Sequence, residues 1–254
     1  MLVCMVLIIS LTTLLWLPFC DRQQRALWLC RWGKAFLRIL NIRLQVATTP
    51  DGALPRGAMI VSNHISWLDV GVISAVFPSL FISKAEVRNW PVIGWLCSQH
   101  HTLFLRRGSR THLRQIGEEI TQSLDEGMNV VVFPEGTTTS GDHVLHFHTA
   151  LIQPALKANK EIYPLAISYW DIPTATSETA SSNVPGSVML QRSQAPAYIE
   201  GISLMQSIFN LLTARALLVQ VCIMPPLTTD NAHRSAAGET ARTQIADAIR
   251  QPIL

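Results

Sequence analysis

The stretch that decides the fold is MIVSNHISWLD, residues 59–69. It opens with an apolar run of the kind found in buried strands and passes through polar residues into an apolar helical pattern that reaches residue 76. Within it, His64 and Asp69 stand five positions apart. The stretch therefore predicts a strand, a short polar loop and a helix, with two chemically useful side chains at the junction.

The spacing of His64 and Asp69 constrains how they can meet. A histidine acts as a general base only when a partner fixes its tautomer, and an aspartate can be that partner. Five residues of an ideal helix turn through about 500°, which leaves the two side chains about 140° apart. They can meet only if His64 lies in the loop and Asp69 in the first helical turn, a junction that Ser62 and Asn63 could cap. Spacing alone favours a capping loop with an incidental histidine.

The chain beyond this stretch repeats the alternation of strand and helix. Short apolar runs predict strands, and longer amphipathic runs predict helices. We expect strands at 59–61, 80–82, 102–105, 129–133, 162–169 and 216–223, and helices at 67–76, 90–97, 111–126, 149–158, 202–212 and 237–250. This order predicts an α/β domain with a mixed, mostly parallel central sheet flanked by helices.

Composition indicates a membrane surface. The 254 residues are 48% hydrophobic and only 15% charged, and the mean hydropathy is positive, which is more apolar than an ordinary soluble enzyme. The net charge is +3, and Lys and Arg form no stripe that would suit nucleic acid. The five cysteines lack metal or redox spacing, which predicts structural thiols in a reducing compartment. We expect a membrane-associated globular protein with no nucleic-acid partner.

The first 20 residues contain no charged side chain. About 20 apolar residues can cross a bilayer as a helix, and the stretch lacks the basic start and cleavage site of a secretory signal. We interpret residues 1–20 as a membrane-anchoring helical segment that spans the bilayer or enters it as a hairpin with residues 25–42. Basic residues follow it, so the positive-inside tendency places the remainder on the cytoplasmic side of the membrane.

Residues 25–42 predict a second, amphipathic helix. Arg31, Lys34 and Arg38 fall within a narrow sector, beside a surface rich in apolar side chains and tryptophan. This pattern suits a helix lying at the level of the lipid headgroups, and the alternative is a core helix with a solvated basic edge.

A stretch rich in proline and glycine, 48–57, indicates a linker after this helix. We therefore divide the chain into an N-terminal membrane segment, 1–46, and an α/β domain, 47–254.

Two further clusters carry polar chemistry. Pro134, Glu135 and Gly136 follow the predicted buried strand 129–133, and ligands of α/β sheets bind at such carboxyl ends; the alternative is a plain turn. Arg106 and Arg107 follow another strand, where an arginine could grip a phosphate. Adjacent residues of a strand point to opposite faces, so only one of these arginines can face a site.

Three histidines lie close together at positions 143, 146 and 148. No carboxylate or thiol accompanies them at the spacing of zinc ligands, which makes a poor zinc signature. We predict no metal.

Four blocks of the sequence together indicate a family. They are NHISWLD at 63–69, FLRR at 104–107, FPEGT at 133–137 and IYPL at 162–165. In order and spacing they resemble the four blocks of the glycerolipid acyltransferases, most nearly the bacterial 1-acyl-glycerol-3-phosphate acyltransferases. The resemblance runs from about residue 59 to residue 227.

The resemblance implies a membrane-bound O-acyltransferase of a bacterial inner membrane that converts lysophosphatidic acid into phosphatidic acid. His64 would take the proton from the free sn-2 hydroxyl, and Asp69 would orient it. Arg107 would grip the acceptor phosphate. The sequence itself allows Lys84 to add a second positive charge there, and the alternative is a surface lysine paired with Glu86. The other implied substrate contacts are Phe133, Pro134, Glu135, Gly136 and Thr137 on the acceptor side and Pro164 on the donor side. The donor would be acyl-CoA or an acyl carrier protein thioester, with no bound cofactor.

Departures from the family pattern keep alternatives open. His101 replaces the glycine that often begins the second block, and Thr138 replaces the arginine that many members carry after Glu-Gly-Thr. Thr138 favours an acyltransferase for another lysolipid, such as lyso-ornithine lipid. A serine hydrolase using Ser66 is disfavoured because no Gly-x-Ser-x-Gly elbow is present. A non-catalytic membrane-binding module is disfavoured because the polar residues of the blocks are intact.

Overall fold

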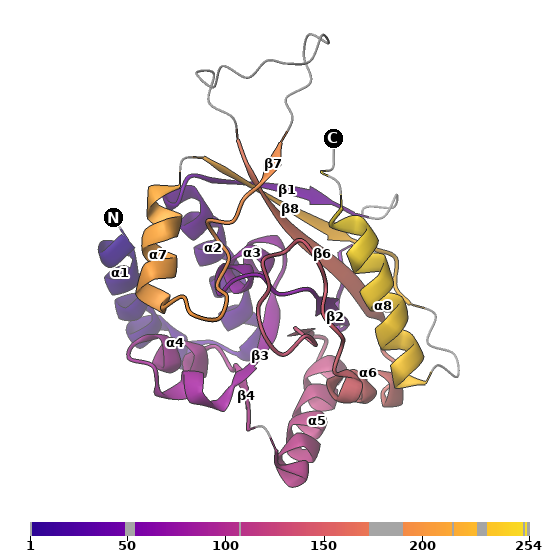
Figure 1. Cartoon of the computed structure of the whole chain (residues 1–254). Coiled ribbons are helices and arrows are strands. Elements are labelled where there is room, and N and C mark those ends of the chain that lie inside the picture. Colours follow the sequence, from indigo (N-terminus) through magenta and orange to yellow (C-terminus); the bar gives the residue numbers. More distant parts are fainter. Residues whose placement is uncertain are drawn as a thin grey trace, which may run out of the picture.

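The computed structural model describes residues 2–48, 54–106, 108–172, 190–214, 216–227, 233–250 and 252. In this part of the chain, one central sheet of eight strands runs through the molecule in the order β1-β8-β6-β2-β5-β3-β4, with β7 beside β6 (Figure 1). Only the pairings of β6 with β7 and β8 are antiparallel. The sheet is thus mixed and mostly parallel, as predicted. The strands are β1 (Ile42–Ala47), β2 (Met59–Ser62), β3 (Ser79–Lys84), β4 (Leu103–Leu105), β5 (Asn129–Val132), β6 (Ile162–Asp171), β7 (Gln191–Arg192) and β8 (Leu217–Ile223).

Helices cover both faces of this sheet (Figure 1). The alternation of side chains along a strand produces two cores: Ile60 of β2 packs with α2, α3 and α7, whereas Met59 and Val61 pack with α5, α6 and α8. The helices are α1 (Leu2–Trp16), α2 (Arg22–Ile39), α3 (Leu68–Val76), α4 (Ile93–Gln99), α5 (Arg110–Asp125), α6 (Gln153–Lys157), α7 (Leu204–Thr213) and α8 (Arg234–Ala248). Short 3₁₀ turns are η1 (Leu17–Phe19), η2 (Ala85–Asn89) and η3 (Thr149–Leu151).

Strand β1 was not expected from the sequence. It pairs in parallel with β8 along its whole length, from Ile42 beside Leu217 to Ala47 beside Cys222. The boundary proposed between residues 46 and 47 therefore falls inside a strand of the central sheet. The predicted helix over 149–158 is divided into η3 and α6. Pro154 stands in the first turn of α6, where proline's lack of a backbone N–H removes no hydrogen bond of the helix.

The N-terminal anchor is the part of the fold prediction that the structure does not support. Helix α1 ends at Trp16, and Pro18 follows it in η1. Its 15 residues rise about 22 Å, and the hydrocarbon core of a bilayer is about 30 Å thick. Among the helices in the described ranges, none is both long and apolar enough to cross a membrane.

Helix α2 packs closely against α3. It begins at a capping box in which Asp21 and Gln24 exchange side chain to backbone hydrogen bonds. Its buried positions, among them Cys30 and Gly33, face α3. The basic residues of the predicted sector, Arg31, Lys34 and Arg38, are exposed. One face of α2 is therefore core and another is a basic surface.

Candidate active site

The candidate site lies where two neighbouring parallel strands end. His64 follows β2 and Glu135 follows β5, and these strands pair directly, with Val61 beside Val132. Helix α3 begins four residues after His64. Two loops at one edge of a sheet and the first turn of a helix thus meet at this point, which is where open α/β sheets bind ligands.

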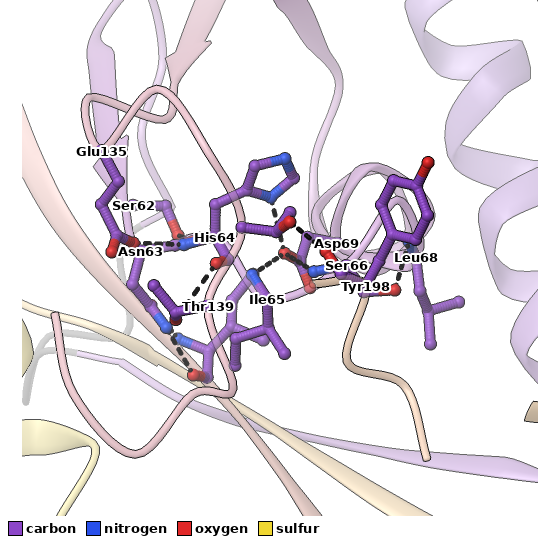
Figure 2. A network of polar contacts seen from close by, with 12 residues as sticks. Ser62, Asn63, His64, Ile65, Ser66, Leu68, Asp69, Glu135, Thr139 and Tyr198 are labelled. Atoms are coloured by element: carbon purple, nitrogen blue, oxygen red, sulfur yellow. Dashed lines mark hydrogen bonds and ion pairs between the residues drawn. The ribbon is translucent and has the colours of Figure 1, made fainter. Parts of the chain in front are cut away.

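The junction geometry predicted for the histidine and the aspartate is confirmed. Asp69 lies in the first turn of α3, and its Oδ2 is 2.8 Å from Nδ1 of His64 in the preceding loop. The Asp69 side chain is fully buried, whereas that of His64 is 21% exposed. Because an ionised carboxylate only accepts hydrogen bonds, Nδ1 donates and Nε2 is the acceptor of the ring. Figure 2 shows this second nitrogen pointing away from the network.

The Asp69 carboxylate also organises the loop around itself. Oδ2 accepts the backbone N–H groups of Ile65 at 2.7 Å and Ser66 at 2.9 Å. Oδ1 accepts the hydroxyl of Tyr169, in β6, at 2.6 Å. Burial, together with the charge of Asp69, raises the pKa of Tyr169 well above its usual value, so this hydroxyl stays protonated and donates. Four hydrogen bonds thus compensate a carboxylate that has no contact with water.

The capping role expected for Ser62 and Asn63 is wrong. Ser62 Oγ donates to the Asn63 carbonyl, 3.0 Å away, and the Asn63 amide forms two hydrogen bonds with the backbone of Ile167 in β6. Asn63 therefore hydrogen-bonds the loop to β6 of the sheet. The backbone N–H groups of Ile65 and Ser66, which precede α3, donate to Asp69 instead. Ser66 Oγ accepts the N–H of Leu68 and is fully buried, which does not suit a nucleophile.

Glu135 holds the same loop from the other side. Its Oε1 accepts the N–H of His64 at 2.7 Å and its Oε2 accepts that of Leu145 at 2.9 Å. The residue is only 4% exposed, and this burial raises its pKa even though both N–H groups oppose the shift. The carboxylate therefore positions the backbone of His64. Its predicted contact with substrate stays a prediction.

The rest of the block after β5 wraps around His64. The ring of Phe133 stacks on the imidazole with centroids 4.0 Å apart, and the N–H of Thr139 donates to the His64 carbonyl at 2.9 Å. Gly136 has a φ of 70°, a value that suits glycine. Pro134 is buried and Thr137 is exposed. The structure thus brings the first and third blocks together, although they are about 70 residues apart in sequence.

The remaining predicted residues lie on or beside other strands, or outside the described part of the chain. Pro164 is buried in β6, beside Val61 of β2. Lys84 is exposed at the end of β3, beside Leu105 of β4. Arg107 lies outside the described residues. Arg106 is exposed, and its backbone N–H donates to Nδ1 of His112.

The histidines at 143, 146 and 148 do not lie on a strand. The rings of His146 and His148 are 6.1 Å apart and perpendicular. Among the residues that the structure describes, no group of three His, Cys, Asp or Glu side chains could hold a metal ion.

Sequence reasoning missed Tyr169 as a member of this site. The residue was read only as the end of an apolar strand. The available signal was chemical, because a tyrosine on a buried strand needs a partner for its hydroxyl. Nothing in the sequence identifies that partner as Asp69, 100 positions away.

Comparison with known proteins finds acyltransferases. A family model described as Acyltransferase matches residues 45–168. The chain is 42% identical to a lyso-ornithine lipid O-acyltransferase of Pseudomonas aeruginosa over 154 residues. This alignment covers 60% of this chain and 58% of the relative. It is 40% identical over 139 residues to a 1-acyl-sn-glycerol-3-phosphate acyltransferase of Neisseria gonorrhoeae, 55% of this chain and 54% of the relative. The chain thus spans a little over half the length of these relatives.

A solved structure shares the fold. The 1-acyl-sn-glycerophosphate acyltransferase PlsC from Thermotoga maritima superposes with a TM-score of 0.62 over 97% of this chain and 89% of its own, at 20% identity. The mixed sheet with flanking helices is therefore the PlsC fold. Residues 45–168, which contain both the His64–Asp69 pair and the Glu135 turn, match the acyltransferase family, and relatives named as acyltransferases align with this chain.

Proposed function

We propose that this protein is an O-acyltransferase that moves a fatty acyl group from a thioester to the free hydroxyl of a lysolipid. The observation that carries the proposal is the 2.8 Å contact between His64 Nδ1 and the buried Asp69 carboxylate. This contact orients an imidazole whose Nε2 can accept a proton, in a chain whose family transfers acyl groups.

The proposed reaction needs no nucleophile from the enzyme. His64 Nε2 takes the proton of the acceptor hydroxyl as its oxygen attacks the thioester carbonyl carbon. A new C–O bond forms, the C–S bond breaks, and the thiolate of the donor leaves and receives the proton from the imidazolium. Asp69 stays ionised and stabilises the imidazolium while it exists. The stacked ring of Phe133 keeps the imidazole in place between the two proton transfers.

The acceptor that we propose first is lysophosphatidic acid, with phosphatidic acid as product. Support comes from the named activity of the Neisseria relative and from the positively charged Lys84 and Arg106 at the ends of neighbouring strands. Lyso-ornithine lipid is the second candidate, because the Pseudomonas relative carries that name. Thr138 favours it as well: its hydroxyl donates to the carbonyl of Tyr198 and supplies no positive charge for a phosphate.

We also propose that the protein works on a lipid surface. Helix α1 and η1 expose a series of large apolar side chains, including Leu11, Leu15 and Phe19, the last 86% exposed. The exposed basic residues of α2 follow directly in the chain. An apolar face beside a basic edge is the pattern of a segment that lies in the headgroup region. The choice between acyl-CoA and acyl carrier protein, and the cytoplasmic face of a bacterial inner membrane as location, remain predictions.

The test is an acceptor panel. The full chain, in mixed micelles, is given labelled acyl-CoA or acyl carrier protein thioester together with lysophosphatidic acid, lyso-ornithine lipid or lysophosphatidylcholine. We expect labelled phosphatidic acid from the first acceptor and loss of at least 100-fold in rate, on the scale of general-base catalysis, for His64→Ala. Transfer only to lyso-ornithine lipid selects the second candidate. Full activity of His64→Ala, or no transfer to any acceptor, contradicts the proposed reaction.

A further inference from the structure

Tyr169 contacts the proposed catalytic pair, His64 and Asp69, from a strand that is distant in the sequence. It lies in β6, is 1% exposed, and donates its hydroxyl to Oδ1 of Asp69 at 2.6 Å. A tyrosine that only fills a core could point its hydroxyl toward a backbone carbonyl or solvent. This hydroxyl instead contacts the carboxylate that orients His64.

The two oxygens of Asp69 have different surroundings. Oδ2 accepts from His64 Nδ1 and from the N–H groups of Ile65 and Ser66. Among the described residues, the hydrogen bond to Oδ1 comes from Tyr169. Both ends of the carboxylate are thereby held, so the carboxyl group cannot rotate away from the imidazole without breaking a short hydrogen bond in a dry environment.

Strand β6 also hydrogen-bonds to the loop between β2 and α3, which carries His64. Asn63, directly before His64, donates to the Ile167 carbonyl at 3.0 Å and accepts the Ile167 N–H at 2.8 Å. Tyr169 is two residues further along, on the same face of the strand. A rigid connection therefore links the residue before the base to the residue that holds the carboxylate.

We infer that Tyr169 is a positioning residue for the proposed acyl transfer, on which this inference rests. It fixes the Asp69 carboxylate in the orientation that receives His64 Nδ1–H, and it draws part of the carboxylate's negative charge away from the imidazole. Sharing that charge makes His64 release its proton more readily, which matters when the departing thiolate must be protonated.

The sign of the effect follows from the groups around the base. Those that face His64 in the described structure are Asp69 from α3, Glu135 from the loop after β5 and, through Asp69, Tyr169 from β6. Without the Tyr169 hydroxyl, more of the Asp69 charge acts on the imidazole, and the proton is held more tightly. The acidic limb of the rate profile then moves to higher pH.

The experiment compares Tyr169→Phe with Ser168→Ala. Ser168 is a buried hydroxyl on the same strand, and it accepts the indole N–H of Trp170 rather than contacting the catalytic pair. For Tyr169→Phe we expect kcat to fall by roughly tenfold with little change in KM, and the NMR titration midpoint of the His64 ring to rise by about half a pH unit. Ser168→Ala should leave both the kcat and the midpoint near wild type.

A second substitution keeps the packing unchanged. Replacing Tyr169 by 3-fluorotyrosine retains the hydroxyl and makes it a stronger donor, so the His64 midpoint should move to lower pH. The inference is overturned if neither Tyr169 variant moves the midpoint, or if Ser168→Ala lowers kcat as much as Tyr169→Phe. The titration of His64 can be measured whether or not the protein transfers acyl groups. If the two Tyr169 variants move the His64 midpoint in opposite directions but the wild-type protein is inactive, the role of Tyr169 is supported and only the proposed function is rejected.

Discussion

Asp69 is a fully buried acid whose hydrogen bonds come from its own loop and from β6. An asparagine at this position can turn its NH₂ group toward His64 Nδ1. The neutral imidazole then carries its proton on Nε2, the atom that accepts a proton in the proposed reaction. We expect Asp69→Asn to lower kcat by about 10³-fold with a smaller effect on KM. Initial rates with saturating donor measure this, and Asp125→Asn, at an exposed position paired with Lys160, is the control. More than half of the wild-type rate for Asp69→Asn would contradict the role.

A second single residue predicts how stability depends on pH. His100 is 7% exposed, neither ring nitrogen has a hydrogen-bond partner within the described part of the chain, and burial lowers its pKa to about 4. The unfolded histidine titrates near 6.5. Between these two values the unfolded chain binds a proton that the folded chain does not. The free energy of unfolding is therefore highest above pH 6.5, as far as His100 is concerned, and declines as the pH falls toward 4.

Replacing this histidine should remove that part of the acid sensitivity. Between pH 7 and pH 4, the unfolding free energy of His100→Leu should fall by about 3 kcal/mol less than that of wild type. Urea unfolding at the two pH values measures the difference, and the exposed His233→Leu is the control. Equal losses in wild type and His100→Leu would show that His100 is not the source.

At the scale of elements, the crossing of α2 over α3 depends on one glycine. A Cβ at Gly33 would lie 2.8 Å from the backbone N of Ala75 and 2.8 Å from the carbonyl O of Gly71. Neither backbone atom can move without displacing α3, which carries Asp69. We expect Gly33→Ala to lower the unfolding free energy by about 2 kcal/mol, although alanine favours helix by about 1 kcal/mol.

Gly117 in α5 provides a matched control. A Cβ there meets only Pro154 Cγ, at an ordinary 3.5 Å. Gly117→Ala should therefore leave stability unchanged or raise it by about 0.5 to 1 kcal/mol. Denaturant unfolding of both variants compares the same substitution in two helices, and a Gly33→Ala variant as stable as Gly117→Ala would mean that the two helices can separate at no cost.

At the scale of the whole molecule, the outer face of α1 exposes large apolar side chains. Leu11 and Leu15 are 56% and 62% exposed. Replacing both by glutamate removes apolar area from the proposed lipid contact, and we expect binding to anionic vesicles to weaken on the order of 100-fold. Vesicle flotation measures it. Val46→Glu, on the exposed side of β1, is the control, and equal binding of the double variant and the control would exclude α1 as the contact.

Several of these features could be predicted from sequence because they are local. The strand at 59–61, the helix after it and the position of Asp69 in its first turn follow from apolar patterning and from the spacing of two residues. The order of strands and helices also predicts a mixed sheet. Strand β1 was missed because its partner, β8, lies about 175 residues away, as the contact of Gln45 with Gln220 shows.

What the sequence by itself determined is the α/β class, which rests on apolar patterning, and the resemblance to acyltransferases, which rests on four blocks in a fixed order. The same blocks single out His64 and Asp69, whose spacing requires a junction between loop and helix. Only the tertiary structure decided that Glu135 holds the backbone of His64, that Asn63 is tied to β6, and that Tyr169 closes the other side of Asp69. The physical reason is that these are hydrogen bonds between strands that become neighbours only when the sheet forms. Local preference determines which residues begin a helix or strand, and packing determines which buried donor finds which acceptor.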